Sequence, residues 1–412
     1  MIRRNAYMDK LHRLKDKNII KVITGVRRCG KSTLLQMFQD EVKNELPNAK
    51  CIDINLESGI FRKIRTSEDL YDYVKNRLHA EEHNYVFLDE IQNIPDFQKV
   101  VDWLFVEKNV DLYITGSNAY LLSGELATLL SGRYIEIKML PLSFAEYMEA
   151  QSIQETNIQK LYNEYLLRSS FPGALEYHDR GDLRNYLEGI YNTILIKDVA
   201  TRKQISDISM LQSVVEYMYD NIGNLSSAAK IAGAMTSSGR KISTNTVEAY
   251  IQALVDSFIL YRVTRYDIKG KDRLRNGAKY YAVDIGLRYY LLGTNMGDIG
   301  HILENVVYLE LLRRENEVFV GKTSTLEVDF VAINKGKKKY YQVSQTILDE
   351  HTLNRELASL KSIKDNYPKY ILTMDYLPDA SFDGIQHINV FDWLAMIEYG
   401  RSIKTKYLVK YE

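Results

Sequence analysis

A short stretch near the start of the chain has the residue types and the spacing of a phosphate-binding loop. From Gly25 to Ser32 the sequence reads G-V-R-R-C-G-K-S, which fits the pattern G-x-x-x-x-G-K-S/T. Backbone N–H groups of such a loop surround the phosphates of a nucleotide, and the N-terminus of the following helix adds positive potential. Lys31 is expected to reach the β- and γ-phosphates, and Ser32 to bind Mg²⁺. The predicted nucleotide contacts are Gly25, Arg27, Arg28, Cys29, Gly30, Lys31, Ser32 and Thr33.

Two adjacent acidic residues end a second apolar segment, Y-V-F-L-D-E-I-Q at residues 85–92. A buried strand would place Asp89 at its C-terminal end, where a carboxylate can order the shell of a Mg²⁺ ion. Glu90 would then be placed to orient and deprotonate a water molecule. The alternative for Glu90 is an ordinary solvated carboxylate at a strand end. A second acid at this position is typical of proteins that hydrolyse ATP.

Further polar residues follow the segment V-D-L-Y-I-T-G-S-N-A at residues 110–119. Because the C-terminal ends of parallel strands meet at the ligand crevice, Thr115, Ser117 and Asn118 are expected near the γ-phosphate or the attacking water. Arg133 could stabilise charge on the transferred phosphoryl group, in its own subunit or in a neighbour's site, or form a surface salt bridge.

Three loop residues leave alternatives open. Arg27 and Arg28 could contact phosphate or pair with nearby acids. Cys29 could be a small packed residue, or its oxidation could block nucleotide binding.

The segments around these residues predict a parallel β-sheet covered by helices on both faces. Each predicted strand is apolar and is separated from the next by a segment with helical spacing of apolar residues. The predicted strands lie within residues 18–24, 50–57, 85–92, 110–119 and 134–140.

Four motifs together resemble the prokaryotic AAA-type ATPases of the archaeal-ATPase group that have a C-terminal domain of unassigned function. The motifs are GVRRCGKSTLL, VFLDEIQNIPDF, ITGSNAYLL and LSGRYIEIKMLPLSFAEY. The resemblance spans essentially the whole chain and implies an AAA-like sheet order and Mg-ATP as the ligand. It also implies the roles given above for Lys31, Ser32, Asp89 and Glu90. One departure is Ser169-Ser170-Phe171-Pro172, where the family often has two glycines before the aromatic residue.

The middle of the chain predicts a helical lid and a winged-helix domain. Three helical segments at 207–223, 226–235 and 243–260 precede two strands with a basic tip. From Arg262 to Lys279 there are seven basic and two acidic residues. This segment could follow a DNA backbone, with residues 243–246 facing a groove, or it could be a solvated loop in a domain that contacts protein.

The last third predicts the element order of a restriction-endonuclease-like fold, namely helix, three strands, helix, strand, and the family resemblance indicates the same fold. Glu304 and Asp329 fit two carboxylate positions of its metal site, and Gln342 could add a neutral oxygen. Ser344 stands where the lysine is expected, and loss of that charge would reduce the rate by orders of magnitude. Three explanations stay open: the lysine has moved to Lys361 or Lys364, the domain binds nucleic acid without cutting it, or it is a scaffold.

Composition excludes several classes. Lys plus Arg and Asp plus Glu number 54 each, so global charge does not favour nucleic acid or anionic membranes. No uncharged apolar stretch is long enough to cross a bilayer, and the N-terminus lacks the apolar core of a secretion signal, so a cytoplasmic location is expected. The two cysteines form neither a disulfide framework nor a metal cluster.

The predicted domains are a P-loop ATPase core (1–148), a helical lid (149–205), a winged-helix-like domain (206–283) and a nuclease-like C-terminal domain (284–412). The leading hypothesis is an ATPase that uses Mg-ATP hydrolysis to reposition these domains. Two alternatives are a nucleotide-gated DNA-binding or signalling switch with incidental turnover, and a DNA endonuclease with a divergent site. Expected partners are ATP, double-stranded DNA, and a protein partner or a second copy of the chain, with no membrane.

Overall fold

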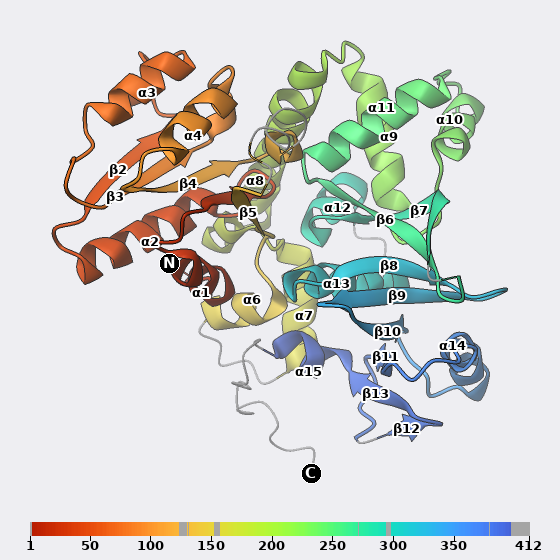
Figure 1. Ribbon diagram of the computed structural model, residues 1–412. Helices are drawn as coiled ribbons and strands as arrows, with labels where there is room; N and C mark the ends of the chain where they lie inside the picture. Colours follow the sequence, from red (N-terminus) through yellow and green to blue (C-terminus); the bar gives the residue numbers. More distant parts are fainter. Residues whose placement is uncertain are drawn as a thin grey trace. The chain divides into compact units, whose positions relative to one another are not determined.

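The computed structural model describes residues 2–122, 130, 132–151, 157–270, 272–293, 298–378 and 380–396. The side chains of residues 120, 122 and 272–276 are not among those described. The chain forms two compact units, Met1–Pro141 with Asp256–Phe258, and Leu142–Val255 with Ile259–Glu412 (Figure 1).

The first unit is built on a five-stranded sheet with the order β2-β3-β4-β1-β5. Every neighbouring pair is parallel, which confirms the predicted parallel sheet. The strands are β1 (Ile20–Thr24), β2 (Lys50–Asn55), β3 (Asn84–Asp89), β4 (Val110–Gly116) and β5 (Tyr134–Lys138).

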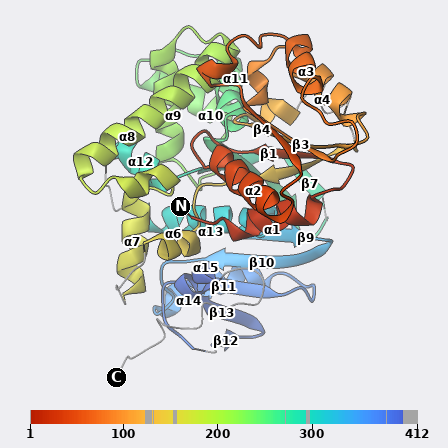
Figure 2. The ribbon, with the colours of Figure 1, turned by 90° about the vertical axis from the view of Figure 1, so that its left-hand side faces the viewer.

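Helices cover both faces of this sheet, as the buried strands require. The helices α1 (Asn5–Leu14) and α2 (Lys31–Glu45) lie on one face, and α3 (Ser67–Lys75) and α4 (Phe97–Phe105) lie on the other (Figure 2). Short helical turns follow three strands: η1 (Gly59–Phe61), η2 (Ile91–Asn93) and η3 (Ala119–Leu122).

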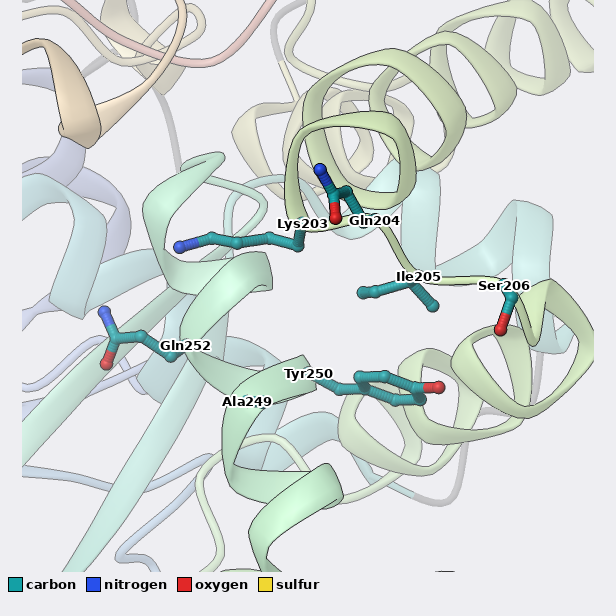
Figure 3. A pocket seen from close by; sticks show the side chains of 7 residues that line it. All are labelled: Lys203, Gln204, Ile205, Ser206, Ala249, Tyr250 and Gln252. Atoms are coloured by element: carbon teal, nitrogen blue, oxygen red, sulfur yellow. The ribbon is translucent and has the colours of Figure 1, made fainter.

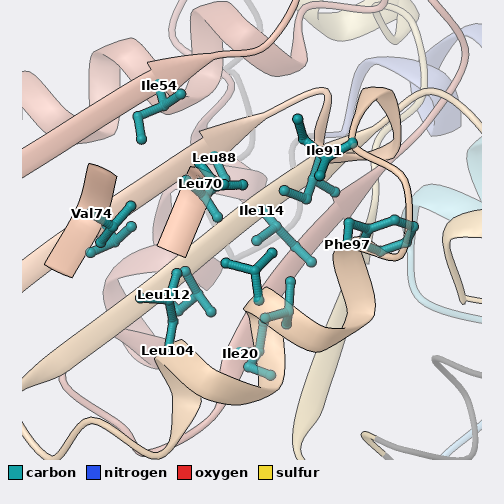
Figure 4. Packing of buried hydrophobic residues seen from close by; sticks show 14 of the residues in the cluster. Ile20, Ile54, Leu70, Val74, Leu88, Ile91, Phe97, Leu104, Leu112 and Ile114 are labelled. Atoms are coloured by element: carbon teal, nitrogen blue, oxygen red, sulfur yellow. The ribbon is translucent and has the colours of Figure 1, made fainter. Parts of the chain in front are cut away.

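Apolar side chains between the sheet and α3 and α4 form the core of this unit. Leu70 and Val74 from α3 and Leu104 from α4 pack against strand residues such as Ile54 and Ile114 (Figure 4). Burial of this continuous apolar cluster fixes the strands in register, and it thereby fixes the loops that follow their C-terminal ends.

The second unit contains helices before, between and after its strands. They are α6 (Phe144–Ala150), α7 (Ile158–Arg168), η4 (Pro172–Glu176), α8 (Arg180–Thr193) with its π-helical continuation η5 (Ile194–Thr201), α9 (Ile208–Asp220), α10 (Ala228–Ser237), α11 (Thr244–Asp256), α12 (Ile285–Leu292), α13 (Ile299–Arg313), α14 (Glu350–Lys361) and α15 (Val390–Ala395). The three helices predicted in the middle of the chain are α9, α10 and α11. The side chain of Ser243 accepts a hydrogen bond from the backbone N–H of Thr246 and so caps α11.

A single eight-stranded sheet, ordered β12-β13-β11-β10-β9-β8-β6-β7, completes the second unit. Its strands are β6 (Leu260–Asp267), β7 (Asp272–Ala282), β8 (Glu317–Lys322), β9 (Glu327–Asn334), β10 (Lys337–Val343), β11 (Lys369–Thr373), β12 (Ser381–Phe382) and β13 (Ile385–Asn389). The predicted order of helix, three strands, helix and strand is present as α13, β8 to β10, α14 and β11.

The hairpin that was predicted as a wing is part of the same sheet. Its strands β6 and β7 are antiparallel, and β6 pairs in parallel with β8. The hairpin therefore joins the predicted winged-helix segment to the predicted C-terminal domain by backbone hydrogen bonds.

The serines at the departure from the family pattern have a structural role in the second unit. Ser170 donates from its backbone N–H (2.7 Å) and its hydroxyl (2.6 Å) to the buried carboxylate of Asp284. The other oxygen of Asp284 accepts from Leu287 and caps α12. A Cβ atom on Gly286 would lie 2.5 Å from the Cα of Ser169, so the two segments are in close contact.

Among the described helices, none is both long enough and apolar enough to span a lipid bilayer.

Candidate functional site

The loop after β1 has two glycines whose backbone conformations exclude most other residues. Gly25 has a φ of +154° and Gly30 a φ of +104°, which are conformations that favour glycine. A Cβ atom on Gly25 would lie only 2.1 Å from the carbonyl oxygen of Met139. Lys31 begins α2 directly after Gly30, so the helix N-terminus is the next feature of the chain after the loop.

The ammonium group of Lys31 lies inside this loop. It donates hydrogen bonds to the carbonyl oxygens of Gly25 (3.0 Å) and Val26 (3.3 Å). It also lies 3.5 Å from the Oε1 atom of Glu90, and both side chains are more than 90% buried. The loop lysine and the acid at the end of β3 therefore form one ion pair.

Asp89 ends β3 and is held by neighbours on both sides. The side chain of Asn55, at the end of β2, donates to its Oδ2 (2.9 Å), and the hydroxyl of Thr115, at the end of β4, donates to its Oδ1 (2.5 Å). Burial, and to a smaller extent the charge of Glu90, raise the pKa of Asp89. Hydrogen bonds from Thr115 and Ser32 lower it, but the net effect is an increase. A nearby cation would reverse this increase, because it would stabilise the carboxylate.

Glu90 lies in the left-handed backbone region, with a φ of +55°, at the turn into η2. Its Oε2 accepts hydrogen bonds from the amide of Gln92 and from the hydroxyl of Ser117 (3.1 Å). Burial alone would raise the pKa of Glu90, but Lys31, Gln92, Arg27 and Ser117 together lower it. The carboxylate is therefore ionised at neutral pH, as a general base must be.

The other predicted contacts in the loop have different environments. Arg27 forms an ion pair with Glu57 (2.7 Å), which is one of the alternatives left open by the sequence, and Arg28 is exposed. Cys29 is fully buried, and burial raises the pKa of its thiol. Ser32 and Thr33 are exposed in the first turn of α2.

Arg133 lies at the N-terminal end of the strands, opposite the end that the loop follows. Its carbonyl accepts from the N–H of Ile20, the first residue of β1, whereas the phosphate-binding loop follows the last residue of that strand. Its guanidinium pairs with Asp102 (2.7 Å), and it is about half exposed. Arg133 cannot reach the loop of its own chain, so only the action in a neighbour's site stays a prediction.

The second unit brings three of the four predicted nuclease-type residues together. Gln342 accepts from the backbone N–H of Asp329 (3.4 Å), and Asp329 and Glu304 both face Lys279. Ser344 instead donates to the carbonyl of Thr346. Of the two lysines proposed as replacements, Lys361 pairs with Asp383 (2.7 Å).

Sequence reasoning missed several residues in these clusters, among them Asn55, Gln92 and Lys279. Gln92 follows Glu90 by two positions and could have been found from the motif. Asn55 and Lys279 come from strands distant in sequence, and their contacts depend on the order of strands in the sheets.

A cavity of about 400 Å³ lies in the second unit between α11 and the segment after η5. It is lined by residues 203–206 and by Ala249, Tyr250 and Gln252, and the Tyr250 ring and Ile205 face each other across it (Figure 3). None of the predicted site residues lines it.

The loop, the acid pair and the sheet order define the first unit as an AAA-type P-loop domain. In agreement, residues 17–148 match the family described as an AAA domain, and residues 159–298 match one described as a domain of unknown function, DUF8612. The chain is 39% identical over 398 residues to an uncharacterized protein of Haemophilus influenzae, covering 96% of this chain and 98% of the relative. It therefore belongs to the same family of AAA-domain proteins as that relative.

More distant similarities extend to archaea. An uncharacterized protein of Methanocaldococcus jannaschii is 29% identical over 399 residues, with 92% of this chain and 86% of the relative covered. Among solved structures, the Aeropyrum pernix ORC1 protein in complex with DNA has a TM-score of 0.33 at 12% identity and covers 71% of this chain and 92% of that chain. AMPPCP-bound DnaA from Aquifex aeolicus has a TM-score of 0.31 at 14% identity and covers 61% and 87%.

Proposed function

We propose that this protein is an ATPase that hydrolyses Mg-ATP and uses the reaction to change the conformation of its second unit. The observation that supports this most directly is the buried cluster of Lys31, Asp89 and Glu90. It combines a cation for phosphate, a carboxylate for Mg²⁺ and an ionised base at one end of a parallel sheet.

The residues present fit a magnesium ion. Mg²⁺ prefers hard oxygen ligands, and the Ser32 hydroxyl and the Asp89 carboxylate supply them. Burial and the charge of Glu90 raise the pKa of Asp89, and a bound cation would stabilise its ionised form. When bound, Mg²⁺ neutralises charge on the phosphates.

Each side chain of this cluster has a separate role in the proposed reaction. Lys31 exchanges its hydrogen bonds to the loop carbonyls for bonds to the phosphates, and this exchange releases Glu90 from the ion pair. Gln92 and Ser117 remain hydrogen-bonded to Oε2 of Glu90, so Oε1 of Glu90 is the oxygen available to accept a proton from water. Thr115 accepts from the backbone N–H of Glu90 and donates to Asp89, and it thereby fixes the spacing of the two acids.

The test is the variant Glu90→Gln. It should bind a fluorescent ATP analogue as the parent does and should release phosphate at least about a hundredfold more slowly, because the base is absent. Glu107→Gln is the matched control, since Glu107 is a partly buried acid bonded to Lys75 at a distance from the cluster. Unchanged phosphate release in Glu90→Gln would refute the role of Glu90.

Association with DNA is the second candidate, and it is supported by the turn between β9 and β10. Lys335, Lys337 and Lys339 are exposed there, around a hairpin turn in which Lys335 and Gly336 both have positive φ. The ATPase rate with and without duplex DNA tests turnover and partner together. Phosphate contacts are strongest at low salt. If a gel shift at low salt shows no binding, the DNA proposal fails and a protein partner becomes the better candidate.

A further inference from the structure

A buried cluster in the second unit surrounds a lysine ammonium with three carboxylates. The Nζ atom of Lys279 lies 2.8 Å from Oε1 of Glu304, 2.9 Å from Oε1 of Glu327 and 3.9 Å from Oδ1 of Asp329. These residues come from three elements, β7, α13 and β9. Only 5% of the surface of Lys279 is exposed.

The geometry is that of an ammonium group paired with carboxylates. Two carboxylate oxygens lie within hydrogen-bond distance of Nζ, and a third lies 3.9 Å away. An ammonium group has three N–H donors, and the distances allow it to donate to Glu304 and Glu327, with Oδ1 of Asp329 3.9 Å away. Removal of the lysine would leave like charges facing one another in a buried site.

Other protein groups also hydrogen-bond to the carboxylates and to Gln342 in this cluster. Oε1 of Glu304 accepts from the Tyr281 hydroxyl (2.5 Å), and Oδ2 of Asp329 accepts from the backbone N–H of Val343 (2.8 Å). The side-chain amide of Gln342 donates to Glu356 (2.8 Å), and its oxygen accepts from Ser359 (3.1 Å). The set of oxygens is one that a divalent cation could use, but the fixed donors direct the carboxylates toward Lys279.

We infer that Lys279 is the built-in cation of this cluster and takes the place of a divalent metal ion. Mg²⁺ and Ca²⁺ bind oxygen at roughly 2.0 to 2.6 Å. An ion that close to Glu304 Oε1 would lie next to an ammonium only 2.8 Å from the same atom, and the two cations would repel each other strongly. The charge of this cluster is therefore balanced by Lys279 rather than by a divalent ion.

The same lysine connects parts of the sheet that share no backbone hydrogen bonds. In the strand order, β8 and β6 separate β9 from β7. Lys279 bridges β7 to β9 and to α13 across that distance, so it ties the β6–β7 hairpin to the rest of the unit. This link accounts for the burial of a lysine at this position.

The test measures Mn²⁺ binding by titration calorimetry on the full chain without nucleotide. The parent and its Asp329→Asn variant should give the same isotherm, which excludes metal at this cluster and leaves any binding at the loop unchanged. Lys279→Gln should gain one Mn²⁺ site, at least about tenfold tighter than any binding in the parent, and Lys279→Gln/Asp329→Asn should lose it.

Circular dichroism checks that each variant is folded. If Lys279→Gln does not fold even with Mn²⁺, the variant Lys279→Gln/Glu327→Gln is measured instead, because it removes one of the repelling carboxylates. Two results would overturn the inference: parental Mn²⁺ binding that Asp329→Asn abolishes, or a folded lysine variant that gains no Mn²⁺ site.

Discussion

The ammonium of Lys31 and the carboxylate of Glu90 lie 3.5 Å apart, and both are buried at the end of the same parallel sheet. In this arrangement the residue that should bind phosphate and the residue that should activate water neutralise each other. Phosphate binding would therefore both use the lysine and free the base, so binding and catalytic readiness are coupled by one contact.

Lys31→Met should weaken ATP binding by at least about a hundredfold, because hydrogen bonds from a charged group to phosphate contribute roughly 1.5–3 kcal/mol each. Equilibrium binding of a fluorescent ATP analogue measures the effect. Lys43→Met is the control, since Lys43 is an exposed lysine on the same helix, α2. Equal affinities of the two variants would contradict the assignment of Lys31.

Gln92→Ala should lower kcat by about tenfold or more with little change in KM, because Glu90 loses a donor that holds it in place. The lost donor also raises the pKa of Glu90, so the acidic limb of the kcat–pH profile moves to higher pH. Gln36→Ala, at an exposed position on α2, is the control. An acidic limb that stays in place would show that Gln92 is only structural.

Gly25→Ala should abolish nucleotide binding and reduce stability by at least about 2 kcal/mol, because the added Cβ atom would meet the Met139 carbonyl at 2.1 Å. Gly59→Ala should change stability by no more than about 0.5 kcal/mol, since nothing lies within 4 Å of its Cβ position. Urea unfolding and analogue binding measure both variants. Normal binding by Gly25→Ala would mean that the loop has another conformation.

Asp284→Ala should destabilise the second unit by about 2–4 kcal/mol, because the buried N–H and hydroxyl donors of Ser170 and the N–H of Leu287 lose their acceptor. Thermal unfolding of the full chain reports the loss. Asp220→Ala should leave the unfolding midpoint nearly unchanged, since Asp220 is exposed on α9. If both variants unfold alike, the serine segment is held by other contacts.

The phosphate-binding loop, the acid pair and the five strands of the first unit could be predicted from the sequence. Their signals are local: the loop is one continuous stretch with two required glycines, and each strand is an apolar run that ends in its functional residues. The site at the strand ends followed because parallel strands bring their C-terminal ends to one edge.

Only the tertiary structure decided which distant residues meet. Sequence spacing offered Lys361 and Lys364 as replacements for a missing lysine, whereas the structure places Lys279 beside Glu304 and Asp329. The sequence also left Arg133 free to act on its own loop, which the direction of β5 excludes. It also separated a winged-helix hairpin from a C-terminal domain that shares a sheet with it. The physical reason is that strand order and direction, set by packing over the whole unit, determine these contacts, whereas local residue patterns determine only the elements themselves.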